Sequence, residues 1–124
     1  MAFDLRERAY SFRHAIRGIL LVIRTQHNAW IHLVATIAVL IAGKLLDVTR
    51  AEWLALVFAI GLVWTAEALN TALEFLADEV SLERRERLGS AKDAGAGAVL
   101  LASITAAIIG LLVFVPHLLA LAER

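Results

Sequence analysis

Residues 51–80 read AEWLALVFAIGLVWTAEALNTALEFLADEV and join a long apolar run to a row of polar side chains. The run from Trp53 to Ala66 contains no charged residue, which is typical of a membrane-spanning helix. An acid, an amide and two further acids then follow at steps of three, four and four residues: Glu67, Asn70, Glu74 and Asp78. At about 100° per residue these side chains lie within one narrow stripe of a helix.

This polar stripe indicates a functional site. An ionisable side chain in a spanning helix is costly, so it normally faces a protein partner, water or a ligand. A single acid would be explained equally well by a buried ion pair or by a position near the lipid headgroups. Several polar groups on one face, with no basic residue in the same span, favour a functional role. We also expect an oligomer, because neighbouring subunits would cover such a stripe better than three helices can.

Composition and hydropathy predict an all-α membrane protein with three spans. The chain has 124 residues, of which 60% are hydrophobic, and its mean hydropathy is +0.76. These values lie well above those of soluble domains. A span needs about 20 apolar residues, so this length accommodates one domain with three spans. We place the spans at 29–46, 53–77 and 94–115, with a loop at 78–93.

The distribution of basic residues predicts the orientation. Arginines are concentrated before the first span and in the 78–93 loop, which also contains Lys92. The other connection and the C-terminal tail have only Lys44, Arg50 and Arg124. By the positive-inside rule the N-terminus and the 78–93 loop face the cytoplasm, and the C-terminus faces the opposite side. The formal net charge is zero, so no nucleic-acid partner is implied.

Residues 1–26 are predicted to form a helix that lies in the membrane interface. Apolar residues recur there at alternating steps of four and three, which marks one face of a helix. These residues are Leu5, Ala9, Phe12, Ile16, Ile19 and Ile23. The rest of the segment is rich in arginine, as in helices that lie on a membrane surface. The alternative is a cytoplasmic helix packed on a partner.

A second group of charged residues stands at the entrance to the third span. Lys92 and Asp93 directly precede the small residues AGAGA at 94–98, which would let neighbouring helices approach closely. Lys92 suits a phosphate oxygen. Asp93 could hold a metal, cap the third helix or orient the lysine. Together with the acidic stripe, this pair indicates phosphate chemistry at the cytoplasmic edge of the membrane.

Four blocks of sequence resemble a known family. They are SFRHAIRGI at 11–19, NAWIHL at 28–33, EALNTALEFLAD at 67–78 and AKDAGAGAVLLAS at 91–103. At this spacing they are similar to the prokaryotic diacylglycerol kinase and undecaprenol kinase family. The resemblance implies a bacterial inner-membrane kinase with an interfacial helix and three spans, working as a homotrimer. It also implies MgATP as phosphoryl donor and a lipid alcohol as acceptor.

The resemblance implies roles for individual residues. Glu67 resembles the catalytic base that takes the proton from the lipid hydroxyl, and Glu74 resembles the acid that holds magnesium on the nucleotide phosphates. Asn70 could fix either acid. The other residues implied to contact the nucleotide are His14 and Arg17 on the N-terminal helix, Glu83, Arg84 and Arg85 in the loop, and Lys92 and Asp93.

One position departs from the family pattern. The family usually has a second metal-binding glutamate just before the first span, and this sequence has Gln26 there. A glutamine offers magnesium a carbonyl oxygen but no charge. We therefore expect either weaker metal binding or a shell that Asp78 or a water completes.

The acceptor and two other functional classes remain open. His32 and its surroundings are more similar to undecaprenol kinases than to diacylglycerol kinases, which favours undecaprenol, giving undecaprenyl phosphate, over diacylglycerol, giving phosphatidic acid. A small oligomeric proton or cation transporter could also use an acidic stripe, but it would place the acids at mid-membrane and would not need Lys92 and Asp93. A structural membrane protein would need neither the EALN block nor the AKD block.

Overall fold

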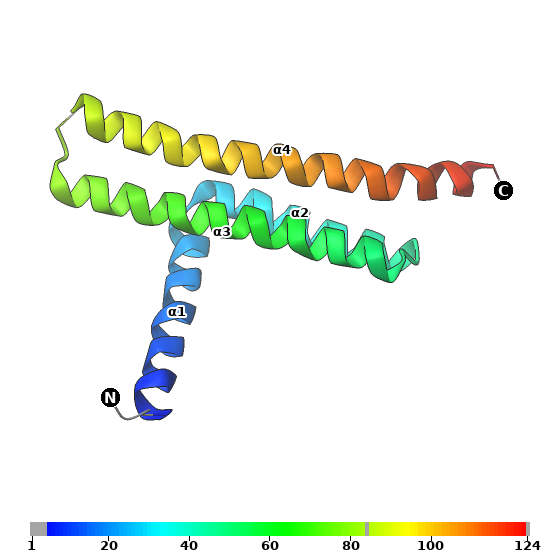
Figure 1. Cartoon of the computed structure of the whole chain (residues 1–124), viewed down its shortest axis with the longest axis horizontal. Coiled ribbons are helices and arrows are strands. Elements are labelled where there is room, and N and C mark those ends of the chain that lie inside the picture. The colour runs from blue at the N-terminus through cyan, green and yellow to red at the C-terminus, as the bar shows by residue number, and fades with distance from the viewer. Residues whose placement is uncertain (1–4, 84, 124) are drawn as a thin grey trace.

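The computed structural model describes residues 5–83 and 85–123, and this part of the chain forms four α-helices (Figure 1). They are α1 (Leu5–Thr25), α2 (His27–Leu45), α3 (Arg50–Val80) and α4 (Glu86–Ala122). The last three are each long and apolar enough to cross a membrane. The all-α fold class and the three candidate spans are thus confirmed.

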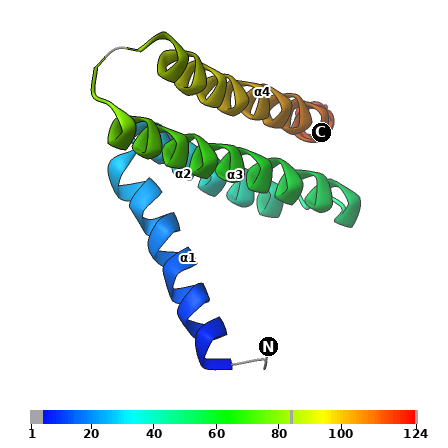
Figure 2. The same cartoon turned by 60° about the vertical axis from the view of Figure 1, so that its left-hand side comes forward.

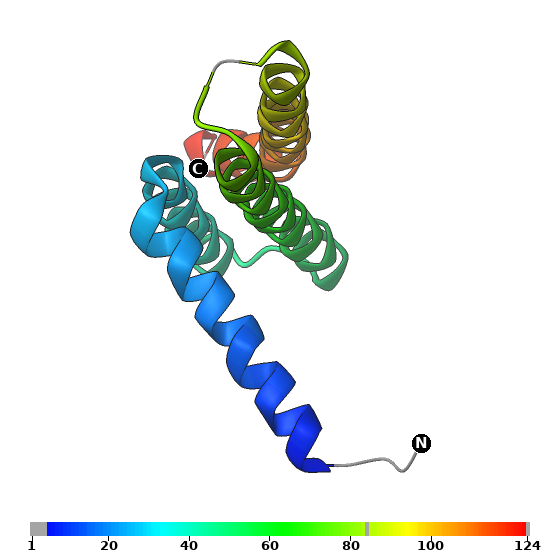
Figure 3. The same cartoon turned by 90° about the vertical axis from the view of Figure 1, so that its left-hand side faces the viewer.

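The three long helices lie side by side, and α1 leads away from them. Helices α3 and α4 are antiparallel neighbours, while α2 lies along another side of α3 (Figures 1 and 2). Seen along the bundle, α1 projects outward from its junction with α2 (Figure 3). The structure therefore contains a separate helix before the first span, and its location in the membrane interface stays a prediction.

A short extended segment separates α1 from α2. Gln26 has extended backbone angles, φ −100° and ψ 120°, and stands immediately before α2. Its N–H still bonds to the Val22 carbonyl over 3.0 Å, and its carbonyl accepts from the Ala29 N–H over 3.2 Å. The change in helix direction therefore occurs at this polar residue with both of its backbone groups paired.

The connection between α2 and α3 is tight. Asp47 lies in the left-handed region, with φ 51°, in the turn after α2. Thr49 then starts α3 through a capping box, in which its side chain accepts from the Glu52 N–H and the Glu52 carboxylate accepts from the Thr49 N–H. Gly43 permits close contact here, since a Cβ on it would lie 2.7 Å from the Trp53 ring. This end of the bundle sets the register between α2 and α3.

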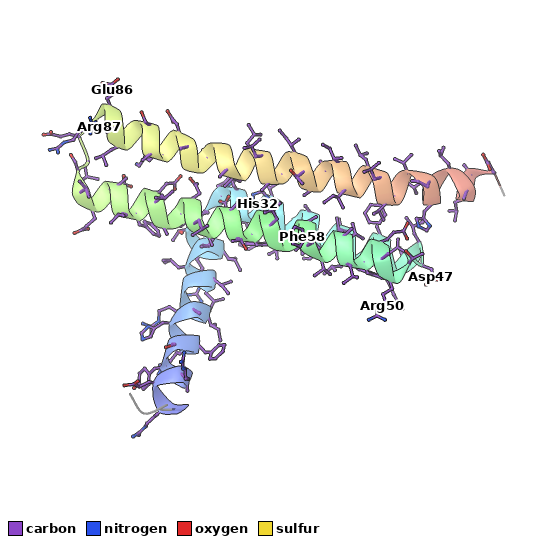
Figure 4. The ribbon with its side chains drawn as sticks, viewed as in Figure 1. His32, Asp47, Arg50, Phe58, Glu86 and Arg87 are labelled. Carbon is purple, nitrogen blue, oxygen red and sulfur yellow. The ribbon has the colours of Figure 1, made fainter. Side chains whose placement is uncertain are left out.

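Charged residues mark both ends of the bundle. Glu86 and Arg87 lie where α4 begins, Asp47 and Arg50 lie at the opposite end, and Phe58 lies between (Figure 4). Phe58 is 71% exposed, as expected for a side chain that faces lipid or another subunit.

The helices are longer than the spans predicted from hydropathy. Helix α3 continues to Val80 and α4 begins at Glu86, so the connection between them is Ser81–Arg85 and not the whole of 78–93. Helix α4 also runs through Pro116 to Ala122. Hydropathy detects only the apolar part of a helix, and the polar turns beyond it remain helical. The positions of the membrane surfaces stay predictions.

Candidate functional site

The polar stripe of α3 passes from buried to exposed along the helix. Glu67 is 1% exposed and Asn70 is 8% exposed, whereas Glu74 is half-buried and Asp78 is exposed. Glu67 faces α2, while Asn70 and Asp78 face α4. A single chain thus covers the two deepest polar groups, and the expected oligomer stays a prediction.

Glu67 lies opposite a histidine of the first span. Its Oε2 is 3.5 Å from His32 Nε2, and the Thr71 hydroxyl donates to the Glu67 backbone carbonyl over 2.8 Å. Figure 4 labels His32 on α2. One signal in the sequence was available, since His32 is the only titratable residue between Ala29 and Gly43. Its pairing with Glu67 could not be predicted, because a pattern within one helix does not give the register between two.

Asn70 is bound to Glu74 and packed against α4. Its Nδ2 donates to Glu74 Oε1 over 3.1 Å, so of the two acids that it could fix, it fixes Glu74. A Cβ on Gly95 would lie 2.4 Å from Asn70 Oδ1. The small residues at the start of the third span therefore allow close helix contact, as predicted.

Lys92 is held by Asp78. Its Nζ donates to Asp78 Oδ1 over 2.5 Å, joining the ends of α3 and α4. This hydrogen bond raises the pKa of Lys92, which precedes the predicted span at 94–115, so the ammonium stays charged across the physiological pH range. Asp93 does not cap α4, whose N-cap is Arg85, so that suggested role is wrong. Its other two suggested roles, holding a metal and orienting the lysine, stay predictions.

The loop residues lie beside Lys92. A hollow of about 240 Å³ is lined by Asp78, Glu83, Arg85 and Lys92 among others. The Glu83 N–H donates to the Ser81 hydroxyl over 3.1 Å, which shapes the turn. Arg84 lies outside the described residues. The structure thus brings both described loop candidates to the predicted phosphate-binding lysine.

Helix α1 does not reach this cluster in the single chain. His14 and Arg17 are exposed, and the hollow that they line, of about 360 Å³, is formed by residues of α1. Because α1 leads away from the bundle (Figure 3), the structure does not bring these two residues to Glu74 or Lys92.

A magnesium ion fits the residues only as a partner of bound phosphates. Among the described residues, no group of three or more His, Asp or Glu side chains could hold a metal by itself. Mg²⁺ is usually held by one or two carboxylates together with substrate phosphates. Glu74 offers one such carboxylate, fixed by Asn70. Gln26, the other residue implied to bind the metal, is half-buried, and its side chain does not cap α2.

Fold and site together define a small multi-pass membrane protein with a buried acid and a charged cluster near one end of its spans. Residues 13–114 match the prokaryotic diacylglycerol kinase family, and the chain belongs to this family of membrane lipid kinases. Family membership confirms the resemblance seen in the sequence and gives no support to a transporter.

Characterised relatives carry two names. The chain is 42% identical over 108 residues to an undecaprenol kinase of Bacillus subtilis, covering 87% of this chain and 88% of that protein. It is 41% identical over 112 residues to a diacylglycerol kinase of Synechocystis, covering 90% of this chain and 64% of that protein. A diacylglycerol kinase of Escherichia coli is 37% identical over 75 residues, covering 60% of this chain and 62% of that protein.

Proposed function

We propose that the chain transfers the γ-phosphate of MgATP to the hydroxyl group of a membrane lipid alcohol, with undecaprenol as the first candidate and diacylglycerol as the second. Membership of the family supports the reaction class. The choice of undecaprenol is supported by the Bacillus subtilis relative, which combines the higher identity with coverage of 88% of its length.

The buried carboxylate of Glu67 is the observation that carries this proposal. It is enclosed at 1% exposure, and among the described residues it faces a histidine and not a permanently charged lysine or arginine. A carboxylate in such a position can accept a proton from a hydroxyl group as the new bond forms. Glu67 is therefore proposed as the general base.

Glu74 and Asn70 are proposed to serve the donor side of the reaction. Glu74 lies seven residues further along α3, about 10 Å from Glu67 along the helix axis. It would hold magnesium bound to the nucleotide, with Asn70 fixing its carboxylate and Gln26 offering at most a neutral oxygen. The ion would neutralise charge on the phosphates.

The charged cluster beyond Glu74 is proposed to bind the nucleotide. Lys92 and the loop residues Glu83, Arg84 and Arg85 would face the phosphates and the nucleoside, with Asp93 beside them. His14 and Arg17 would join them only if α1 moved or a neighbouring subunit supplied them, which a homotrimer permits. Basic residues at this end orient it towards the cytoplasm, where ATP is available.

Phosphate transfer to each lipid tests the proposal. The purified protein in detergent micelles would receive γ-labelled ATP with undecaprenol or diacylglycerol, and the labelled lipid would be identified. We expect labelled undecaprenyl phosphate to form faster than phosphatidic acid. Transfer to neither lipid would contradict the function, and transfer to diacylglycerol alone would contradict the order of acceptors.

A further inference from the structure

His32 and Glu67 bring two buried polar atoms face to face across α2 and α3. His32 Nε2 and Glu67 Oε2 lie 3.5 Å apart, and the two side chains are 14% and 2% exposed. Within the described residues neither atom has a hydrogen-bond partner. Leaving buried polar atoms unpaired costs free energy, so such a pair needs a physical reason. A small polar group that bonds to both atoms would provide one.

One hydroxyl group has the donor and acceptors that this pair needs. Its O–H can donate to Oε2 of the Glu67 carboxylate, while one of its two lone pairs accepts from the Nε2–H of His32. Two atoms 3.5 Å apart can both lie about 2.8 Å from one oxygen placed to their side. The second lone pair of the hydroxyl oxygen then stays free to attack phosphorus.

The position of His32 is fixed from α3. Trp64 Nε1 donates to Thr36 Oγ1 over 3.0 Å, and Thr36 Oγ1 donates to the His32 carbonyl over 2.7 Å. The Trp64 ring also meets the imidazole edge-on, with centroids 6.3 Å apart. Trp64 and Glu67 are three residues apart and therefore lie on the same face of α3. This face both positions His32, through Trp64, and carries the Glu67 carboxylate that His32 faces.

His32, the α2 member of the pair, lines the polar end of an apolar cavity. This cavity, of about 440 Å³, lies between α2, α3 and α4, and its polar lining residues are His32, Thr36 and Ser103. On α3 the lining ends at Val63, one turn before Glu67. A molecule with a hydroxyl at one end and an apolar body matches this arrangement.

We propose that His32 binds the hydroxyl oxygen of the lipid acceptor and, with Glu67, orients it for phosphoryl transfer, while the first part of the lipid tail occupies the cavity. The proposal rests on the proposed kinase function. In the transfer, the alcohol O–H bond breaks and its proton passes to Glu67 Oε2. The alcohol oxygen bonds to the γ-phosphorus, and the bond from that phosphorus to the bridging oxygen breaks to release ADP. His32 gains and loses no proton, and it contributes orientation.

Three substitutions of His32 test the hydroxyl contact in mixed micelles with undecaprenol and, separately, diacylglycerol. His32→Ala removes the donor and should lower kcat/KM for the lipid by about tenfold or more, with the KM for ATP changed by less than about twofold. His32→Gln carries an N–H near the place of Nε2 and should restore most of the loss. His32→Asn is one carbon shorter and should not.

A matched histidine provides the control. His117 also contacts a glutamate, Glu52, at 3.2 Å, but at the opposite end of the bundle, so His117→Gln should leave the kinetic constants unchanged. The proposal is overturned if His32→Ala keeps normal kcat/KM for the lipid or loses mainly ATP affinity. It is also overturned if the Gln and Asn variants are equally impaired.

Lipid binding without ATP separates this proposal from the kinase function. With Trp30 and Trp53 replaced by Phe, the emission of Trp64 reports on the neighbouring His32. Undecaprenol should change that emission, and His32→Ala should weaken binding by about tenfold. This holds even if the wild type transferred no phosphate, an outcome that would contradict the proposed function alone. Binding that His32→Ala leaves unchanged would overturn the hydroxyl contact.

Filling the cavity tests the location of the tail. Ala35 lines the cavity, whereas Ala38, three residues further along α2, does not, and both residues are exposed. Ala35→Leu should raise the KM for undecaprenol several-fold, and the matched Ala38→Leu should not. An unchanged KM in Ala35→Leu would overturn the placement of the tail.

Discussion

Glu67 and Glu74 carry the same carboxylate in different surroundings, and this difference divides the proposed work between them. Glu67 is enclosed and faces His32, whereas Glu74 is half-buried and accepts a hydrogen bond from Asn70. An enclosed carboxylate suits proton transfer with a hydroxyl, while one nearer to water can hold a hydrated cation. Two identical side chains can therefore serve the acceptor and the donor of one reaction.

Replacing Glu67 should separate chemistry from binding. Glu67→Gln keeps the shape of the side chain but cannot accept the proton, so we expect kcat to fall about 100-fold or more. The KM for ATP should change little, because the nucleotide is proposed to bind further along α3. Steady-state kinetics with both substrates varied would measure this. Near-normal turnover, or a loss confined to ATP affinity, would refute the assignment.

Two further variants serve as a contrast and a control for Glu67→Gln. Lys92→Ala should raise the KM for ATP, since it removes the ammonium proposed to face the phosphates. Glu79→Gln changes an exposed acid of the same helix and should leave both constants unchanged. A similar loss in all three variants would point to general damage to the helix bundle.

The dependence of activity on magnesium should be determined by Glu74, the one charged residue proposed to hold the ion. Glu74→Gln should abolish activity at ordinary magnesium concentrations, because Gln26 supplies no second charge. Gln26→Glu should lower the magnesium concentration needed for half-maximal activity. Activity measured across a magnesium titration checks both changes. If neither variant alters the titration, magnesium binds elsewhere.

At the level of single residues, the sequence predicted the relative positions of the site residues on α3 better than their contacts with α2 and α4. The spacing of Glu67, Asn70 and Glu74 placed them on one face because they share a helix. The contacts of that face with His32 and Gly95 depend on how three helices pack. The spacing of residues within one helix carries no information about this packing. For the same reason the hydrogen bond between Lys92 and Asp78, which are fourteen residues apart in the sequence, was not predicted.

At the level of helices, the contact between α3 and α4 controls the site. Gly95 lies directly over Asn70, so the glycine determines how closely the two helices approach. Asn70 in turn fixes Glu74. A change in the packing of α4 would therefore move Asn70 and, through it, the carboxylate of Glu74 that is proposed to bind the metal.

Gly95→Ala and Gly97→Ala form a matched test of this contact. A Cβ at Gly95 would meet Asn70 Oδ1 at 2.4 Å, whereas one at Gly97 would meet no neighbouring atom of the described residues within 4 Å. Gly95→Ala should therefore displace the Asn70 amide and destabilise the fold by about 1–3 kcal/mol. Gly97→Ala should be neutral or stabilising by up to about 1 kcal/mol, because alanine favours helices. Denaturation in detergent and activity against magnesium would measure the two effects, and equal behaviour would contradict the argument.

The helices themselves were easier to predict than their ends. Apolar runs indicated the three long helices, because a segment that crosses a membrane must pair its own backbone N–H and C=O groups, and a helix does this. The turns at 78–80 and 86–93 have no continuous apolar run, so hydropathy did not indicate that they are helical. Those turns also hold Asp78 and Lys92, whose ion pair joins the two helices.

On the scale of the whole molecule, the single chain completes one part of the proposed site and leaves another open. Glu67 and Asn70 are covered by α2 and α4 of the same chain. Asp78 is exposed, and α1 carries His14 and Arg17 away from the bundle. Large apolar residues such as Phe58 and Leu101 are also exposed along the spans, so lipid or further subunits must cover them.

We therefore expect the active particle to contain three copies of the chain, although Glu67 needs no neighbour for its burial. Additional copies would cover the open, charged end of the site, where α1 of the isolated chain does not reach. In mild detergent, light scattering with the detergent contribution subtracted should give about three times the 13.5 kDa chain mass. Activity should disappear as dilution in detergent separates the copies. A monomer that keeps full activity would show that one chain builds the entire site, and His14 and Arg17 would then have to reach the nucleotide by a movement of α1 itself.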